Sequence, residues 1–454
     1  MKKNVWFGLF NLALIATFVL SACAQPAAAP PTTAPAAVQP TSAPAAVQPT
    51  TAPAAGQMVT IRWRTRPDNK AEQDVYQQIS DDLSKQLASQ GITLQYDPAP
   101  VTGYFDKLTT EFSAGNAPDV VWIAGANTGD YAPKGVLLDL MPLAKADTNF
   151  KLTDYYDVPM KELTQGGHLW GLPRDISTLV MFYNKDLFKA KGLKDPADEA
   201  KAGNWTWDTF RKDAIALTDS ASGVYGFSFS DWWGLWGWFV YGAGGSFFNA
   251  DRTACALNSD GAQKGLQFMA DLFLKDKVST APGVEGGASE TTFVNGKVGM
   301  FPNGRWFVPS MRENAKFDWG VVEMPKGDVQ STWLFWGAYE VSAKTKYPQQ
   351  AWTVIKALTS PDVQAKVAAL GTNIPSNKAQ SAVDAFLNSK PPADNQPFIA
   401  GASYAQAEMT LTTGSWGDIG GAYQTQMDNV LQGKSSVADA VKAACDKANP
   451  MFNK

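Results

Sequence analysis

The feature that most restricts the fold of this chain is an alternation of strand-like and helix-like segments between residues 58 and 125. Residues 58–63 and 92–97 alternate apolar and polar side chains, as half-buried strands do, and residues 119–125 form a continuous apolar run. The two stretches between these runs carry apolar residues at the spacing of one helical face. This β-α-β-α-β order with short crossovers predicts a mostly parallel sheet with helices on both faces.

Strand-like runs and helical stripes keep alternating along the rest of the chain, and the last quarter is mainly helical, so we predict the α/β class. Thr206 and Ser259 are predicted helix N-caps, because a hydroxyl oxygen can accept from the free backbone amides of a first turn. Ligands of parallel sheets bind beyond the carboxyl ends of the strands. One such end lies near residues 98–104, which makes Tyr104 a candidate ligand contact.

Residues 1–22 have the features of an export signal. Lys2 and Lys3 precede an uncharged, largely apolar run that is too short for a membrane span of about 20 residues and ends in small residues. Residues 20–23, Leu-Ser-Ala-Cys, look like a bacterial lipobox, where the exported chain is cleaved before the cysteine and lipid is attached to it. We therefore expect Cys23 to be a lipidated N-terminus; the alternative is an ordinary signal with a free thiol nearby.

The segment after the signal cannot build a hydrophobic core. Residues 24–57 contain no charged side chain, are rich in proline and repeat the nine-residue unit AAVQPTSAP as AAVQPTTAP. We interpret residues 23–57 as a disordered tether in an extended, polyproline-like conformation. About 400 residues follow it, more than one core usually holds, so two lobes are expected.

Charge and cysteine content restrict the partners and the redox state. Loss of Lys2 and Lys3 with the signal takes the formal net charge from −4 to −6, which argues against a nucleic-acid partner. Besides Cys23 the chain contains Cys255 and Cys445. Export permits a disulfide between them, but their spacing leaves the pairing open.

Four tryptophans fall within residues 231–239, Asp-Trp-Trp-Gly-Leu-Trp-Gly-Trp-Phe. A sugar ring presents a flat apolar face and a rim of hydroxyls, so a sugar site needs aromatic plates for the face and fixed polar groups for the rim. Indoles supply such plates at little cost in rotamer entropy. The alternative is that these indoles fill the core, and at least one of the four is expected to do so.

Six segments of the chain resemble a known family, in that family's order. They include APDVVWIAG (117–125), TWDTFRKDAIALT (206–218) and FVNGKVGMFPNGRWFVP (293–309), and the others lie at 167–193, 317–327 and 351–379. From residue 58 onward the chain is similar to the extracellular solute-binding proteins of family 1, the sugar-capturing subunits of ABC importers related to maltose-binding protein. The resemblance implies a two-lobe, periplasmic-binding-protein-like α/β fold of type II with the ligand cleft between the lobes.

The same resemblance divides the folded part of the chain. Residues 58–177 and 338–385 would form the N-terminal lobe, and residues 178–337 and 386–454 the C-terminal lobe. The chain would cross between the lobes near residues 176–179, 333–338 and 379–390.

The resemblance also implies ligand contacts. Trp306, in NGRWFVP, matches the segment where maltose-binding protein places a sugar-stacking tryptophan, and Gly304 would let the backbone approach the ligand. Arg305 departs from the small residue that is frequent there; it would add a hydrogen bond to the ligand or point to solvent. Trp336 and Trp416 have core packing as an equal alternative. The predicted ligand-binding residues are Tyr104, Asn127, Asp175, Ser177, Trp233, Trp236, Gly304, Trp306, Trp336 and Trp416.

The resemblance implies a monomeric receptor that captures a mono- or oligosaccharide by hinge closure and delivers it to the transmembrane permease subunits of an ABC importer. Lipidated Cys23 would hold the receptor at the outer face of the cytoplasmic membrane. We expect no catalytic activity, cofactor or metal site: His168 is the only histidine, and no glycine-rich phosphate loop is present. Two alternatives stay open, a non-sugar solute such as a polyol or glycerophosphodiester, and a lipid-anchored glycoside hydrolase with two carboxylates across the cleft.

Overall fold

The computed structural model of the chain describes residues 58–283, 289–407, 411 and 414–452. The chain divides into two compact units, residues 1–49 and 50–454, and every described residue belongs to the second unit. The predicted export signal, the tether and the lipidation of Cys23 lie outside the described residues. Within these residues, none of the helices combines the length and the apolar character of a membrane span.

A seven-stranded sheet contains the strands predicted in the first part of the chain. Its strand order is β10-β4-β9-β3-β1-β2, with β11 paired to β9. The strands are β1 (Val59–Arg64), β2 (Ile92–Tyr96), β3 (Val120–Ala124), β4 (Gly171–Thr178), β9 (Trp333–Val341), β10 (Ile374–Pro375) and β11 (Gln406–Ala407). β1 pairs in parallel with both β2 and β3, which confirms the parallel arrangement predicted for residues 58–125.

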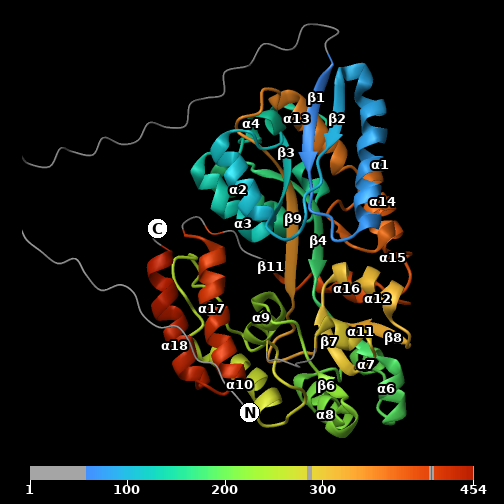
Figure 1. Cartoon of the computed structure of the whole chain (residues 1–454), viewed down its shortest axis with the longest axis vertical. Coiled ribbons are helices and arrows are strands. Elements are labelled where there is room, and N and C mark those ends of the chain that lie inside the picture. Colours follow the sequence, from blue (N-terminus) through green and yellow to red (C-terminus); the bar gives the residue numbers. More distant parts are fainter. Residues whose placement is uncertain (1–57, 284–288, 408–410, 412–413, 453–454) are drawn as a thin grey trace, which may run out of the picture. The chain divides into compact units, whose positions relative to one another are not determined.

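β9 departs from that parallel pattern. It comes from far along the chain, lies between β3 and β4, and runs antiparallel to both (Figure 1). All nine of its residues are buried, as expected of a central strand. The helices that precede or follow the strands of this sheet are α1 (Lys70–Leu87), α2 (Tyr104–Ala114), α3 (Gly125–Tyr131), α4 (Met141–Ala146), α5 (Asp157–Leu163), α13 (Pro348–Leu358), α14 (Pro361–Leu370) and α15 (Gln380–Leu387).

A second, four-stranded sheet has the order β6-β7-β5-β8. Its strands are β5 (Val180–Asn184), β6 (Tyr225–Phe227), β7 (Val298–Asn303) and β8 (Trp319–Val322). The 3-10 turn η6 (Arg305–Phe307) follows β7 directly. The helices from this part of the chain are α6 (Lys185–Ala190), α7 (Pro196–Lys201), α8 (Trp207–Leu217), α9 (Trp233–Gly242), α10 (Asp260–Leu274), α11 (Glu290–Val294) and α12 (Val308–Asn314). Three more helices, α16 (Gln396–Gly401), α17 (Trp416–Leu431) and α18 (Val437–Ala448), come after β10.

Local capping explains where several of these helices begin. The hydroxyl oxygen of Thr206 accepts from the Thr209 amide at the start of α8, and that of Ser259 accepts from the Ala262 amide at the start of α10, so both predicted N-caps are confirmed. Asn69 caps α1 in the same way. A side-chain acceptor at this position satisfies an amide that has no partner inside the helix.

A disulfide joins Cys255 to Cys445 and answers the question that the sequence left open. Cys445 lies in α18, which packs beside α17 (Figure 1), and Cys255 lies in the loop before α10. Both cysteines are buried. The bond closes a sequence separation of 190 residues and fixes the C-terminal helical hairpin to the part of the chain that contains α9 and α10.

Candidate functional site

A cavity of about 1210 Å³ lies at the carboxyl ends of β1, β3 and β4, the edge at which sheets of this kind bind ligands. Its lining continues through the amino-terminal half of β9, the residue before α9, and the turn and helix that follow β7. Elements of both sheets therefore border one cavity. The lining residues that carry the argument are Arg66, Trp122, Arg174, Asp175, Ser177, Trp232, Glu290, Trp306, Arg312, Phe335 and Trp336.

Three aromatic side chains of this cavity pack against one another, and we call Trp232, Phe335 and Trp306 the aromatic wall. Phe335 stacks on the Trp232 indole, with ring centroids 5.1 Å apart and planes 29° apart. It meets the Trp306 ring edge-on at 5.4 Å. Phe335 is buried, whereas both indoles are only partly buried. The indoles thus offer rigid apolar surface to a flat ligand face.

A fourth indole, Trp122 in β3, is the neighbour of two positive charges. The guanidinium of Arg66 lies 4.6 Å from the ring centroid and that of Arg174 lies 5.0 Å from it, both within cation–π range. Arg174 also donates to Asp175 Oδ2 at 2.6 Å and to the Tyr76 hydroxyl at 3.0 Å. Burial lowers the pKa of Arg174, but the Asp175 carboxylate more than offsets this, so the pKa lies well above its usual value. Burial raises the pKa of Asp175, although the Arg174 guanidinium opposes that shift. The pair fixes hydrogen-bonding groups beside the cavity.

Four of the predicted ligand contacts line the cavity: Asp175, Ser177, Trp306 and Trp336. Trp336 is 3 % exposed and packs across Gly125, where an added Cβ would lie 2.3 Å from Trp336 Cε2. The position of the Trp336 indole therefore requires that residue 125 has no side chain. The structure brings these four residues together from β4, β9 and η6.

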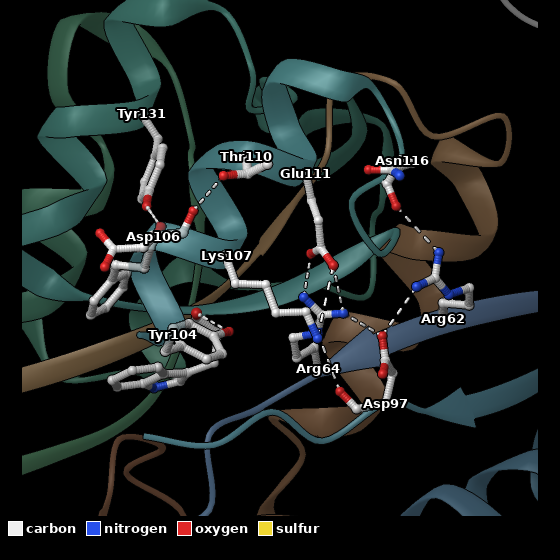
Figure 2. A network of polar contacts seen from close by, with 12 residues as sticks. Arg62, Arg64, Asp97, Tyr104, Asp106, Lys107, Thr110, Glu111, Asn116 and Tyr131 are labelled. Atoms are coloured by element: carbon white, nitrogen blue, oxygen red, sulfur yellow. Dashed lines mark hydrogen bonds and ion pairs between the residues drawn. The ribbon is translucent and has the colours of Figure 1, made fainter. Parts of the chain in front are cut away.

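Three other predicted contacts do not line the cavity. Tyr104 is buried at the start of α2, and its hydroxyl donates to the Trp122 carbonyl oxygen at 2.8 Å (Figure 2). Asn127 lies in α3, and its side chain donates to Asp130 Oδ2 at 3.1 Å. At Gly304 an added Cβ would lie 2.1 Å from Trp306 Cζ3, so this glycine makes room for the indole of its own neighbour.

The tryptophan-rich stretch divides between the cavity and the interior. Trp232 lines the cavity, whereas Trp233 packs against Trp232 and against Trp416, with centroids 5.1 Å and 4.6 Å away. Trp236 is fully buried, and its indole N–H donates to Gln424 Oε1 at 2.9 Å. Trp416 is 4 % exposed and lies outside the cavity lining.

The carboxyl end of β1 shows why charge alone does not locate the site. Arg64 is buried and forms ion pairs with Asp97 and Glu111, and Arg62 reaches the same Asp97 carboxylate (Figure 2). Burial by itself would raise the pKa of Asp97, but the guanidinium groups of Arg64 and Arg62 outweigh it, so the pKa lies below its usual value. This network holds α2 against the ends of β1 and β2, and only Arg66, two residues further on, reaches the cavity.

The predicted ligand contacts did not include three aromatic lining residues, Trp122, Trp232 and Phe335, or the two lining arginines Arg66 and Arg174. A usable signal existed for Trp122, since it is the third residue of a strand whose carboxyl end borders the site. Phe335 gave no such signal, because every residue of β9 is apolar or buried and the strand has no outward face.

Little in the described part of the chain points to metal or histidine chemistry. No group of three or more His, Cys, Asp or Glu side chains among the described residues could hold a metal ion. His168 does not line the cavity; its Nδ1 lies 2.8 Å from Asp139 Oδ2 and its ring stacks on Trp170 at 5.0 Å. This is the arrangement of a turn residue at the surface.

Comparison with known proteins identifies relatives of this architecture. The family model described as bacterial extracellular solute-binding protein matches residues 69–365. A binding protein of Brucella abortus is 26% identical over 380 residues, which cover 80% of this chain and 87% of that protein. The galactooligosaccharide-binding protein of Bacillus subtilis is 29% identical over 261 residues, 56% of this chain and 58% of that protein.

Solved structures show the same fold. The ABC substrate-binding protein from Listeria monocytogenes in complex with cycloalternan has a TM-score of 0.77 at 24% identity, over 88% of this chain and 100% of that chain. The α/β, type II periplasmic-binding-protein fold predicted from the sequence is therefore confirmed.

Proposed function

Because this chain belongs to the bacterial extracellular solute-binding protein family, we propose that it captures a carbohydrate outside the cell and delivers it to the permease subunits of an ABC importer. The observation that carries the proposal is the aromatic wall beside a set of fixed polar groups in one cavity. The partly buried indoles of Trp232 and Trp306 suit the apolar face of a sugar ring, and the Arg174–Asp175 pair suits its hydroxyls.

The size of the cavity favours an oligosaccharide over a single sugar ring. Pockets for drug-sized ligands measure about 300–1,000 Å³, and this cavity measures about 1210 Å³. The name of the galactooligosaccharide-binding relative supports the same ligand class.

The proposed mechanism is closure of two lobes around the ligand. Residues 58–177 and 338–385 form one lobe, and residues 178–337 and 386–454 the other. A sugar that touches Asp175 on one side and Trp306 on the other gains contacts only when both are close, so binding shifts the population toward the closed state. The protein acts as a monomer, and lipid on Cys23 with the proline-rich tether keeps it near the permease.

The charge pattern of the cavity favours a neutral ligand over a phosphate-bearing one. A phosphate would need cations that are free to turn toward it. Arg174 is paired with Asp175, and Arg66 lies 3.2 Å from Asp68 Oδ1. Lys70 Nζ lies 2.7 Å from Asp74 Oδ1, and the guanidinium of Arg312 donates to three backbone carbonyl oxygens. The same balance disfavours a glycerophosphodiester as the solute.

The arrangement of carboxylates gives little support to a glycoside hydrolase. Such enzymes need one carboxylic acid and one carboxylate placed on either side of the scissile bond. The cavity lining contains four carboxylates, Asp68, Asp175, Glu290 and Glu313. Three of them are held by neighbours: Asp175 by Arg174, Asp68 by Arg66, and Glu290, whose Oε1 accepts from the Asn303 side chain at 2.8 Å. We infer that the protein binds its ligand without chemical turnover.

A thermal-shift screen tests the function directly. Purified protein is heated with neutral mono- and oligosaccharides, polyols and glycerophosphodiesters, since a ligand at a hundred times its Kd stabilises the native state by about 2.7 kcal/mol. We expect a neutral oligosaccharide to give the largest shift, with an affinity that changes little as salt is raised. Stabilisation by a phosphodiester that salt abolishes would contradict the neutral-sugar proposal, and release of shorter sugars from an incubated oligosaccharide would contradict the receptor.

A further inference from the structure

Arg305, next to Trp306, has unusual surroundings for a charged side chain. It is 0 % exposed, and no carboxylate pairs with it among the described residues. Its guanidinium donates to Asn395 Oδ1 and to the Ser389 carbonyl oxygen, the latter at 3.2 Å. The same group lies over the rings of Phe386 and Phe398, 4.8 Å and 5.2 Å from their centroids.

A buried guanidinium without a carboxylate is costly. Burial lowers the pKa of Arg305, and the nearby positive charge of Arg312 lowers it further. An apolar side chain of similar length would fill the same space at a smaller desolvation cost. What only arginine supplies is a planar fork that donates in two fixed directions at once.

The two acceptors of this fork belong to one segment of the chain. Ser389 and Asn395 lie between α15 and α16, where the chain passes from helices beside the first sheet to a helix that contacts both β4 and β5. Arg312 donates to the same Ser389 carbonyl oxygen at 2.6 Å, and the Asn395 side chain donates to it at 3.0 Å. The segment 389–395 is therefore itself fixed by hydrogen bonds, and it can hold the neighbouring turn Arg305–Phe307 in place.

Arg305 fixes its own turn from a second direction as well. Its backbone N–H donates to Ser177 Oγ at 2.8 Å, and Ser177 lines the cavity in β4. The next residue, Trp306, places its indole against Gly304 on one side and edge-on to Phe335 on the other. The side chain of Arg305 thus points into the interior while that of Trp306 borders the cavity.

We propose that Arg305 is a positioning residue for the ligand site, which holds the turn Arg305–Phe307 between β4 and the segment 389–395 so that Trp306 faces the cavity. The inference rests on the proposed function only in that Trp306 is taken to contact the ligand. It replaces both sequence-based alternatives for Arg305, a hydrogen bond to the ligand and exposure to solvent, because the side chain lies outside the cavity and is fully buried.

A readout that needs no ligand tests the positioning role. In protein labelled with 5-fluorotryptophan, loss of one fluorine resonance in Trp306→Phe identifies Trp306. We expect Arg305→Met to shift and broaden that resonance, and Arg305→Lys to do so less, because an ammonium can still reach one of the two acceptors. The matched control is Arg64→Met, another buried arginine, which lies outside the cavity and whose loss lowers stability but leaves the Trp306 resonance in place. An unchanged Trp306 resonance in both Arg305 variants would overturn the proposal.

A double-mutant cycle on the full chain then separates positioning from general stability. Binding of maltotetraose, as a single pure sugar, is measured by calorimetry for wild type, Arg305→Met, Trp306→Ala and the double variant. Arg305→Met should raise Kd by about fivefold in the wild-type background and leave it unchanged when Trp306 is already alanine. An equal increase in Kd in both backgrounds, or no increase in either, would contradict the inference. If wild type binds no maltooligosaccharide and no sugar of the thermal-shift screen stabilises it, the proposed function fails, while the fluorine resonance still decides the role of Arg305.

Discussion

Replacement of Trp306 by alanine is the most direct test of the aromatic wall. The indole is partly buried and stands edge-on to Phe335. If a bound sugar covers on the order of 60 Å² of the ring, the loss at 25 cal/mol per Å² is about 1.5 kcal/mol. That corresponds to roughly a tenfold increase in Kd, in the range of aromatic hot spots.

The fold should survive this change. Trp306 contributes one edge contact with Phe335, worth about 1 kcal/mol, and the turn remains held by Arg305. Isothermal calorimetry at 25 °C with the oligosaccharide found in the thermal screen gives Kd, and circular dichroism checks that the variant is native. The melting temperature should fall only slightly.

Trp238 provides the matched control. It is 1 % exposed, stacks on Phe239 with centroids 3.7 Å apart and lies outside the cavity. Trp238→Phe should lower the free energy of unfolding by about 1–3 kcal/mol and leave Kd unchanged. Native-like Trp306→Ala with wild-type affinity would remove Trp306 from the binding surface and leave the carbohydrate proposal without its main support.

Three further outcomes are expected. Burial raises the pKa of Glu340, which accepts a hydrogen bond from Thr128, to about 8, against a usual value of 4.5. Between these two pH values the native state keeps a proton that the unfolded chain releases. The free energy of unfolding therefore falls by about 1.4 kcal/mol per pH unit through that interval and then levels off. Chemical denaturation of Glu340→Gln should lack this fall, and an unchanged pH profile would contradict the assignment. Reduction of the Cys255–Cys445 disulfide should lower the free energy of unfolding by about 3–5 kcal/mol, because it releases a closed loop of 190 residues, and an unaltered melting temperature in reducing agent would refute this. Replacement of Cys23 by serine should release the protein from membranes into the soluble fraction, which fractionation of cells measures; retention in the membrane fraction would argue for another anchor.

Local patterns could predict the parallel part of the first sheet, but they could not predict β9. The runs at residues 58–63, 92–97 and 119–125 are close in sequence, and their spacing allows only short crossovers. β9 pairs Val341 with Val120, more than two hundred positions away. A fully buried strand carries no mark of which neighbours it joins, because the hydrophobic pattern of a sequence indicates burial and not the pairing partner.

The same limit explains why only some of the predicted tryptophans line the cavity. Their number suggested an aromatic surface, and Trp232 does line the cavity. Because α9 is buried on all sides from Gly234 onward, helical spacing does not separate a cavity face from a core face. Trp232 reaches the cavity because it precedes the helix. An added Cβ at Gly234 would lie 2.6 Å from its ring, so the position of Trp232 depends on that glycine.

Glycines of this kind set the geometry of the site, and they do so without adopting unusual backbone conformations. Gly304 has extended backbone, with φ −89°, and the contact that requires it is the Trp306 ring beside its Cα. Gly337 lies in β9, and an added Cβ there would lie 2.2 Å from Nε1 of Trp122, the indole on which the two cavity arginines rest. A glycine in a sequence indicates a turn or a close approach, but the group that approaches is known only once distant segments are paired. At both positions that group is an indole of the site and not the ligand. Gly304 and Gly337 therefore determine where the indoles of Trp306 and Trp122 can lie.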